Sequence, residues 1–329
     1  ENANLANDHN QLVMDLMKRI ARKHNFAVLL HEKPYSGVNG SGKHNNWSLC
    51  TDTGINLFAP GKNPKGNMLF LTFLVNVLMM VYKNQNLLRA SIMSAGNSHR
   101  LGANEAPPAI LSIFLGRQLS ATLDDIVRQV GDDKMTAEEK TTLKLGIGRI
   151  PEILLDTTDR NRTSPFAFTG NKFEFRMPGS AENLSDANTI LNTAVAKELK
   201  QFVADVEGAA DFECAAAAWV KKTLNDHRRV IFNGNGYSEA WEAEAARRGL
   251  PNRKCTPDAM VALKEEKNIS LMEEFGVLTK TEMLSRYEVE MEHYSKIINM
   301  EALTTSDMAK TEILPAVMKF AKDVCDMAA

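Results

Sequence analysis

The segment HEKPYSGVNGSGKHNNWSL, residues 31–49, concentrates residue types that can bind a charged ligand. Its glycines can take positive φ and let the backbone approach a ligand closely, and they are Gly37, Gly40 and Gly42. The polar residues among and after them supply hydrogen-bond donors, positive charge and a candidate metal ligand, and they are Asn39, Ser41, Lys43 and His44. This composition predicts a site for chemistry at a phosphate or a carboxylate.

Residues Gly37 to Lys43 also match the spelling GxxxxGK of a nucleotide-binding P-loop. A P-loop requires Ser or Thr after the lysine, to bind magnesium, and a helix whose first amide groups face the phosphates. Here His44 follows the lysine, and the next residues, NNWSL, alternate between polar and apolar, which indicates a strand. We therefore reject the P-loop interpretation, and a glycine-rich hairpin without function is the stronger alternative to a site.

Two later segments have a similar polar character. The first is GNSHRLGANEAPPA, which begins at Gly96, and the second runs from Asp156 to Ser180. Within the second, KFEFR alternates strictly, so that Lys172, Glu174 and Arg176 share one strand face and the phenylalanines take the other. Charged side chains on one face form either a solvated edge or the lining of a site.

The elements that must position these segments are strands early and helices late, a pattern that predicts an α+β fold. Short strands are expected at residues 26–31, FAVLLH, and near Trp47. A first helix carries an apolar stripe that we expect to pack in the core, formed by Leu12, Val13, Leu16, Met17 and Ile20. Further helices are expected at about 67–82, 85–94, 183–207, 211–228, 237–249, 256–267 and 279–298, with a charged helical insertion at 116–150.

The last of these helices carries two features of its own. A heptad-like seam packs either within the domain or against another subunit, and it consists of Leu284, Tyr287, Met291, Tyr294 and Ile298. An acidic run is expected to be a solvated face, and it consists of Glu288, Glu290 and Glu292.

Composition narrows the function classes. The chain has 329 residues, a formal net charge of -2 and a pI near 6.5, so it shows no electrostatic signature of a nucleic-acid or anionic-membrane partner. Four cysteines without a CxxC pair suggest neither a disulfide scaffold nor a zinc site, and reduced thiols fit a cytoplasmic location.

The apolar run Met68 to Tyr82 is short and interrupted by polar residues, so we expect a core helix. Because the sequence starts at Glu1 without methionine, a targeting segment or a domain ahead of it stays open.

Three segments in order carry a resemblance to a known family: GVNGSGKHNNWSL, then NSHRLGANEAP, then DRNRTSPFAF followed by KFEFRMPGSAENLSDAN. They resemble glutamine synthetase, and the long chain with its insertion is similar to the third, long-chain type. The resemblance implies ATP-dependent ligation of ammonia to glutamate through a γ-glutamyl phosphate, which yields glutamine, ADP and phosphate. It also implies a curved, mostly antiparallel sheet, with residues 1–180 as the C-terminal part of the catalytic domain and 181–329 as a mainly helical region.

The same resemblance assigns roles to residues. His44 and Glu174 match ligands of Mg2+ or Mn2+, and Arg162 and Arg176 match the arginines that bind the transferring phosphoryl group. Substrate glutamate is expected at Asn39, Gly40 and Arg100, and Glu105 matches the carboxylate of a flap that closes over the site. ATP is expected to contact Asn46, Ser48, Arg162 and Lys172. These side chains are therefore expected to face a common cavity.

Two departures qualify the resemblance. Shorter family members have an arginine five residues after the equivalent of Arg162, where this chain has Ala167. The third ligand of the first metal and all ligands of the second would precede Glu1, so we expect a fragment that is inactive by itself.

The resemblance implies stacked hexameric rings, that is, a dodecamer, for the whole protein. The alternatives are a ligase that joins glutamate to a larger amine and a non-catalytic structural relative.

Overall fold

The computed structural model describes residues 3–60, 64–103, 106–128 and 163–328. Within these ranges the strands are β1 (Asn45–Trp47), β2 (Ile113–Phe114), β3 (Phe166–Phe168) and β4 (Phe173–Phe175). They form a sheet in the order β1-β4-β3-β2, in which β4 pairs antiparallel with both neighbours and β2 pairs parallel with β3. The α+β prediction, the mostly antiparallel sheet and the strands near Trp47 and at KFEFR are confirmed.

The core lies against one face of this sheet. Phe166, Phe173 and Phe175 are fully buried, and the rings of Phe166 and Phe173 stack with centroids 4.9 Å apart. Phe70 of helix α2 (Pro64–Ala90) reaches the same cluster through Phe168, at 5.7 Å between centroids. Strict alternation along β4 therefore leaves its charged residues on the opposite face.

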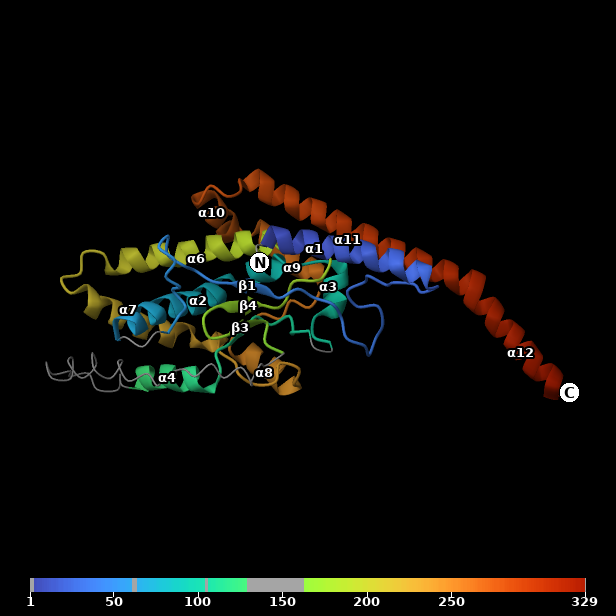
Figure 1. Ribbon diagram of the computed structural model, residues 1–329, viewed down its shortest axis with the longest axis horizontal. Helices are drawn as coiled ribbons and strands as arrows, with labels where there is room; N and C mark the ends of the chain where they lie inside the picture. Colours follow the sequence, from blue (N-terminus) through green and yellow to red (C-terminus); the bar gives the residue numbers. More distant parts are fainter. Residues whose placement is uncertain (1–2, 61–63, 104–105, 129–162, 329) are drawn as a thin grey trace.

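Helix α2 is the central helix and packs against α6 (Ser185–Val206) and α7 (Phe212–His227), as Figure 1 shows. Two helices were expected here, but the structure has one, with non-helical angles at Asn84 (φ -116, ψ 22). The Asn84 side chain donates to the Met80 carbonyl (3.0 Å), which accounts for the kink between the two expected segments. Residues Met68–Ala90 are long and apolar enough to cross a membrane, yet 72% of the most apolar window is buried inside the protein, as expected for a core helix.

The remaining helices are α1 (Ala3–Lys23), α3 (Ala95–Arg100), α4 (Arg117–Arg128), α8 (Glu239–Arg247), α9 (Thr256–Met260), α10 (Glu266–Glu274), α11 (Lys280–Met308) and α12 (Leu314–Ala328). The helices expected at 183–207, 211–228 and 237–249 are confirmed. The one expected at 256–267 is instead α9, a 3-10 turn and the start of α10, and α11 extends ten residues past its expected end at 298. Helix α4 is the described part of the expected insertion, whose remainder lies outside the described residues.

The prediction of a strand at residues 26–31 is wrong. This segment has no regular structure, and Phe26 and Leu29 are 73% and 60% exposed. A strand requires a neighbour for its backbone hydrogen bonds, and none of the described strands pairs with this segment.

The first helix is confirmed as α1, but its apolar stripe is not core. The five stripe residues are between 40% and 57% exposed, and they are Leu12, Val13, Leu16, Met17 and Ile20. Amphipathic spacing predicts a helix that needs a partner, but it does not identify the partner. Within the described part of the chain no element buries this face.

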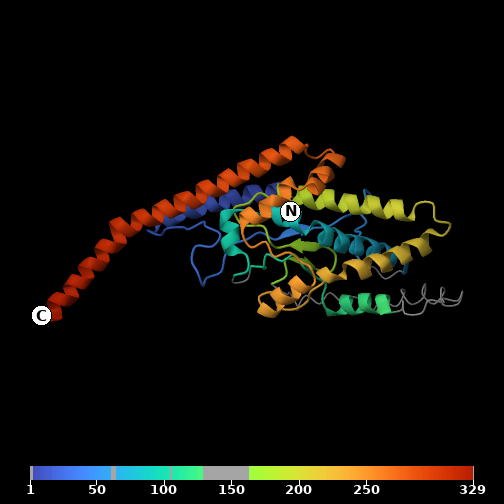
Figure 2. The same cartoon turned by 180° about the vertical axis from the view of Figure 1, so that it is seen from behind.

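Helices α11 and α12 form a long rod with a π-helical turn (Ala309–Ile313) between them, and α12 projects away from the body (Figures 1 and 2). The heptad-like seam is half-buried against the chain itself, except for Leu284, which is 36% exposed. The acidic run is not wholly solvated, because Glu290 lines a cavity.

Candidate functional site

The glycine-rich loop is attached to the segment that follows β4. Ser41 N donates to the Glu32 carbonyl (2.7 Å), Lys43 N donates to the Pro178 carbonyl (2.9 Å), and Gly42 forms a bridge with Gly179. Strand β1 begins two residues later, at Asn45. The chain therefore continues from the loop into a strand and not into a helix, as rejection of the P-loop requires.

The glycines of this loop serve two different purposes. Gly37 takes positive φ (81°), as predicted, but Gly40 and Gly42 do not. They are needed for close approach, since a Cβ at Gly40 would lie 2.7 Å from the Glu32 carbonyl oxygen and one at Gly42 would lie 2.0 Å from Arg100 Nη2. The backbone at Gly42 thus packs directly on the Arg100 guanidinium.

Six predicted site residues lie on one face of the sheet. In the register of β1 and β4, Asn46 is opposite Glu174. Continuing that register by two residues in each direction places His44 beside Arg176 and Ser48 beside Lys172 on the same face. Ser48 Oγ contacts the Asn171 carbonyl (3.3 Å), in agreement with this arrangement. The polar face defined by these six residues is the candidate site.

Charge is balanced at the centre of the polar face. Glu174 Oε2 lies 3.7 Å from His44 Nδ1, accepts a hydrogen bond from Arg176 Nε (3.0 Å) and forms an ion pair with Arg176 Nη2 (3.0 Å). Glu174 and Arg176 are buried, whereas the His44 side chain is 58% exposed. A buried carboxylate next to an accessible imidazole can bind a cation from the solvent side.

This pair fits two positions in the coordination sphere of a divalent ion, because imidazole nitrogen and carboxylate oxygen are both ligands that Mn2+ accepts. In the described ranges no group of three or more His, Cys, Asp and Glu could hold a metal. Among the described residues the pair His44 and Glu174 would supply two ligands, and the metal role that the resemblance implies for them stays a prediction.

Arg100 lies next to the polar face but is buried, with 4% of its surface exposed. Its Nη1 donates to Asn97 Oδ1 (3.0 Å) and to the Met177 and Pro178 carbonyls (3.0 and 3.3 Å). Nη2 donates to the Arg176 carbonyl (3.2 Å). Burial lowers the pKa of this guanidinium, and the charge of Glu32 partly offsets the effect. In this structure Arg100 holds the chain after β4 in place, and the role expected for it at substrate glutamate stays a prediction.

The structure describes fewer contacts, or none, for the other predicted site residues. Asn39 is exposed in the loop, and Glu105 and Arg162 lie outside the described residues. Ala167 is buried on β3 directly opposite Glu174, so the position where shorter family members have an arginine faces the carboxylate.

Sequence reasoning missed the residues that support this site. Asn97 is fully buried, and its amide donates to the Ile92 and Met177 carbonyls (2.6 and 3.0 Å) while its oxygen accepts from Arg100. Glu32 is also buried, and its carboxylate accepts from Ala181 N (2.8 Å). Their position inside the polar segments was the available signal, since Asn97 precedes Arg100 by three residues and Glu32 opens the glycine-rich segment.

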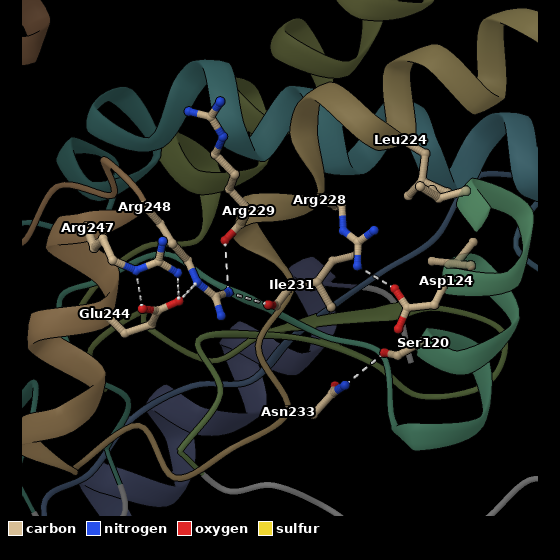
Figure 3. A pocket seen from close by; sticks show the side chains of 12 residues that line it. Ser120, Asp124, Leu224, Arg228, Arg229, Ile231, Asn233, Glu244, Arg247 and Arg248 are labelled. Carbon is tan, nitrogen blue, oxygen red and sulfur yellow. Dashed lines mark hydrogen bonds and ion pairs between the residues drawn. The ribbon is translucent and has the colours of Figure 1, made fainter. Parts of the chain in front are cut away.

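A cavity of about 680 Å³, lined by none of the residues of the polar face, lies between α4, α7 and α8 and contains several arginines (Figure 3). Two carboxylates offset two of the four positive charges, and three of the arginines are engaged with them. Arg228 pairs with Asp124, and Arg247 and Arg248 both bind Glu244, whose pKa these hydrogen bonds lower to about 2. Arg248 also donates to the Ile231 carbonyl (2.9 Å). We therefore do not take this cavity as the catalytic site.

Comparison with known proteins gives concordant matches. Residues 1–109 match the model of the glutamine synthetase catalytic domain, and residues 215–329 match that of the glutamine synthetase C-terminal domain. The chain is 64% identical to a glutamine synthetase of Bacteroides fragilis over 97% of its length and 46% identical to one of Butyrivibrio fibrisolvens over 98%. It is 44% identical to a type-3 glutamine synthetase of Dictyostelium discoideum over 99%. The chain spans 44% to 46% of the length of these relatives.

Proposed function

We propose, since the chain belongs to the glutamine synthetase family, that it contributes to the ATP-dependent joining of ammonia to the side-chain carboxylate of glutamate. The reaction would proceed through a γ-glutamyl phosphate and release ADP and phosphate. The polar face of the sheet is the observation that carries this proposal. It combines an imidazole, a carboxylate, a guanidinium and an ammonium on one face of the paired strands β1 and β4.

The reaction poses an electrostatic problem, because the glutamate carboxylate and the γ-phosphate of ATP are both anions. Arg176 is buried and held by a hydrogen bond and an ion pair to Glu174, so its guanidinium is oriented before substrate binds. Arg162 would bind the same phosphoryl group, and Lys172, Asn46 and Ser48 would contact ATP. Ala167 contributes no charge, so neutralisation of the phosphate would use one cation fewer than in the shorter family members or a cation from elsewhere.

His44 and Glu174 would hold Mg2+ or Mn2+ together with further ligands, and the ion would neutralise charge on phosphate oxygens. Arg100, Asn39 and Gly40 would bind substrate glutamate, and Glu105 would close over the site and exclude the water that hydrolyses an acyl phosphate. Because Arg100 is bound to backbone carbonyls, glutamate would have to bind at its remaining donors or displace a carbonyl.

The whole protein is proposed to be a cytoplasmic homo-oligomer of stacked hexameric rings. The exposed apolar stripe of α1 supports association, because contiguous exposed apolar surface marks contact sites.

The decisive experiment measures ATP-dependent glutamine formation by the full-length protein, with hydroxylamine and methylamine as competing nucleophiles. Glu174→Gln should lower kcat at least a hundredfold, because it removes a metal ligand and the partner of Arg176. Glu288→Gln, an exposed position on α11, is the matched control and should keep full activity.

Two outcomes would contradict the proposal. Equal or better turnover with a bulkier amine than with ammonia would favour a ligase for larger amines. An inactive full-length protein with normal folding would favour a non-catalytic relative.

A further inference from the structure

A cavity of about 510 Å³, here called the α11 cavity, lies apart from the polar face. Its walls come from α11, the start of α6, the connection between α2 and α3, and residues 30–32, which precede the glycine-rich loop. None of the predicted site residues that the structure describes lines it. One wall is apolar and rich in methionine, with Met93, Met272 and Met283. Its size and mixed lining are typical of sites for small organic molecules.

Glu32 lines this cavity, and one oxygen of its carboxylate accepts no hydrogen bond from the described residues. The residue is 3% exposed, and Oε2 has no hydrogen-bond partner among the described residues, although Oε1 accepts from Ala181 N. Two glycines make room for it, since a Cβ would lie 2.1 Å from Oε1 at Gly179 and 2.8 Å from Oε2 at Gly96. A buried acceptor without a donor is costly, so a donor that enters the cavity would be stabilised there.

The charge that lines the cavity is mainly negative. Three further carboxylates line it, and they are Asp186, Glu290 and Glu301, together with the carboxyl group of Glu182, whose pKa burial raises to about 8. Among the described residues of the lining, Arg286 is the one lysine or arginine, and it lies 3.6 Å from Asp186. Two histidines, His31 and His293, also line the cavity. Lys43 and Arg100 lie near Glu32 and Glu182, and Arg89 lies near Glu182, but these three side chains donate hydrogen bonds to backbone carbonyls and to Asn97.

We propose that the α11 cavity binds an organic cation that carries a primary ammonium group on an apolar body. The ammonium supplies three donors, one of which satisfies Glu32 Oε2, and the methionine wall contacts the apolar body. A bare metal ion fits poorly, because the described residues contain no group of three metal-ligating side chains. The main chain of Glu32 also accepts from Ser41 N, so an occupant would contact the residue that anchors the glycine-rich loop.

The test is isothermal titration calorimetry of the full-length protein with 4-phenylbutylammonium, and with 4-phenylbutanol as a neutral probe of similar shape. The ammonium should bind with one site per chain and at least tenfold more tightly than the alcohol. Glu32→Gln should weaken ammonium binding at least tenfold, and it preserves the acceptor for Ala181 N. Glu290→Gln should weaken binding by a smaller factor, and Glu288→Gln on the solvent side of the same helix should leave it unchanged.

Titration of the Glu174→Gln variant distinguishes binding in the α11 cavity from binding at the proposed catalytic site. Binding that survives Glu174→Gln but not Glu32→Gln supports the α11 cavity. Binding that is lost with Glu174→Gln and kept with Glu32→Gln would place the amine on the polar face and overturn the proposal, as would equal affinity for the two probes.

Discussion

At the scale of single residues, two buried acids illustrate how a neighbour decides the cost of burial. Glu198 is 3% exposed and accepts from Lys83 Nζ at 2.8 Å. The partly buried Glu182 forms no ion pair with any described residue, although Ser94 Oγ donates to it (2.8 Å). Burial, and secondarily the charge of Glu32, raise the pKa of Glu182 to about 8, while Arg89 opposes the rise. The protein therefore holds a proton on Glu182 that an unfolded chain would release.

This proton makes stability depend on pH. The pKa of Glu182 is 4.5 in its ordinary state and about 8 in the fold, so folding stability should fall as pH rises between these values. Glu182→Gln should remove this dependence and stabilise the protein by on the order of 2 kcal/mol at pH 8.5, with little effect at pH 4.5. Thermal unfolding at the two pH values measures the difference.

Glu198→Gln is the comparison, because it leaves Lys83 without its carboxylate partner and should destabilise by about 1–3 kcal/mol. An equal effect of Glu182→Gln at both pH values would show that no proton is taken up there on folding.

At the scale of elements, the loop, α3 and β4 are joined through one guanidinium. Arg100, the last residue of α3, donates to the backbone after β4 and lies under Gly42 of the loop. Its neighbour Asn97 binds the same backbone at the Met177 carbonyl. These contacts align β4 with the loop, so that His44 and Glu174 meet.

The same packing predicts a strong coupling between Gly42 and Arg100. Gly42→Ala should destabilise by about 1–3 kcal/mol, because the new methyl group would overlap the guanidinium. In an Arg100→Ala background the same substitution should cost much less. Urea unfolding of the four proteins of this cycle gives the coupling energy.

Gly37→Ala is the control within the same loop. It has positive φ and no atom within 4 Å of an added Cβ, so it should cost about 1 kcal/mol in either background. A cost of Gly42→Ala that is independent of Arg100 would contradict the packing described.

At the scale of the whole molecule, the body is well packed while apolar faces stay open at its periphery. The α1 stripe is one such face, and α12 carries another, with Phe320 71% exposed and Val317 59% exposed. Helix α12 continues directly from the π-helical turn and projects from the body (Figure 1). Surfaces of this kind are consistent with contacts between subunits.

Introducing charge on the α1 stripe should therefore disrupt assembly and leave the fold intact. Leu16→Glu combined with Ile20→Glu should shift the full-length protein to smaller species in sedimentation velocity, with an unchanged circular dichroism spectrum, because both side chains are at least 40% exposed. Gln11→Glu combined with Arg22→Gln alters exposed residues of the same helix with the same change in net charge and should preserve the assembly. No change of size for the stripe variant would exclude α1 from the interface.

The sequence by itself determined which residues form the polar face and that this face lies on a sheet. The alternation of KFEFR depends only on the two-residue period of a strand, so Lys172, Glu174 and Arg176 could be assigned to one strand face without a structure. That Asn46 lies opposite Glu174 follows from the pairing of β1 with β4. The long helices followed from periodicity in the same way.

Tertiary structure alone decided what those elements meet. Groups far away in the chain decide whether residues 26–31 pair as a strand and whether the α1 stripe is buried. In the same way, the distant Arg100 is the reason that residue 42 must be a glycine. Glu32 and Glu182 are ordinary acids in the sequence, and only folding brings them close enough to share one buried environment. Local periodicity fixes the direction of a side chain, whereas desolvation and close contact depend on neighbours that local sequence does not specify.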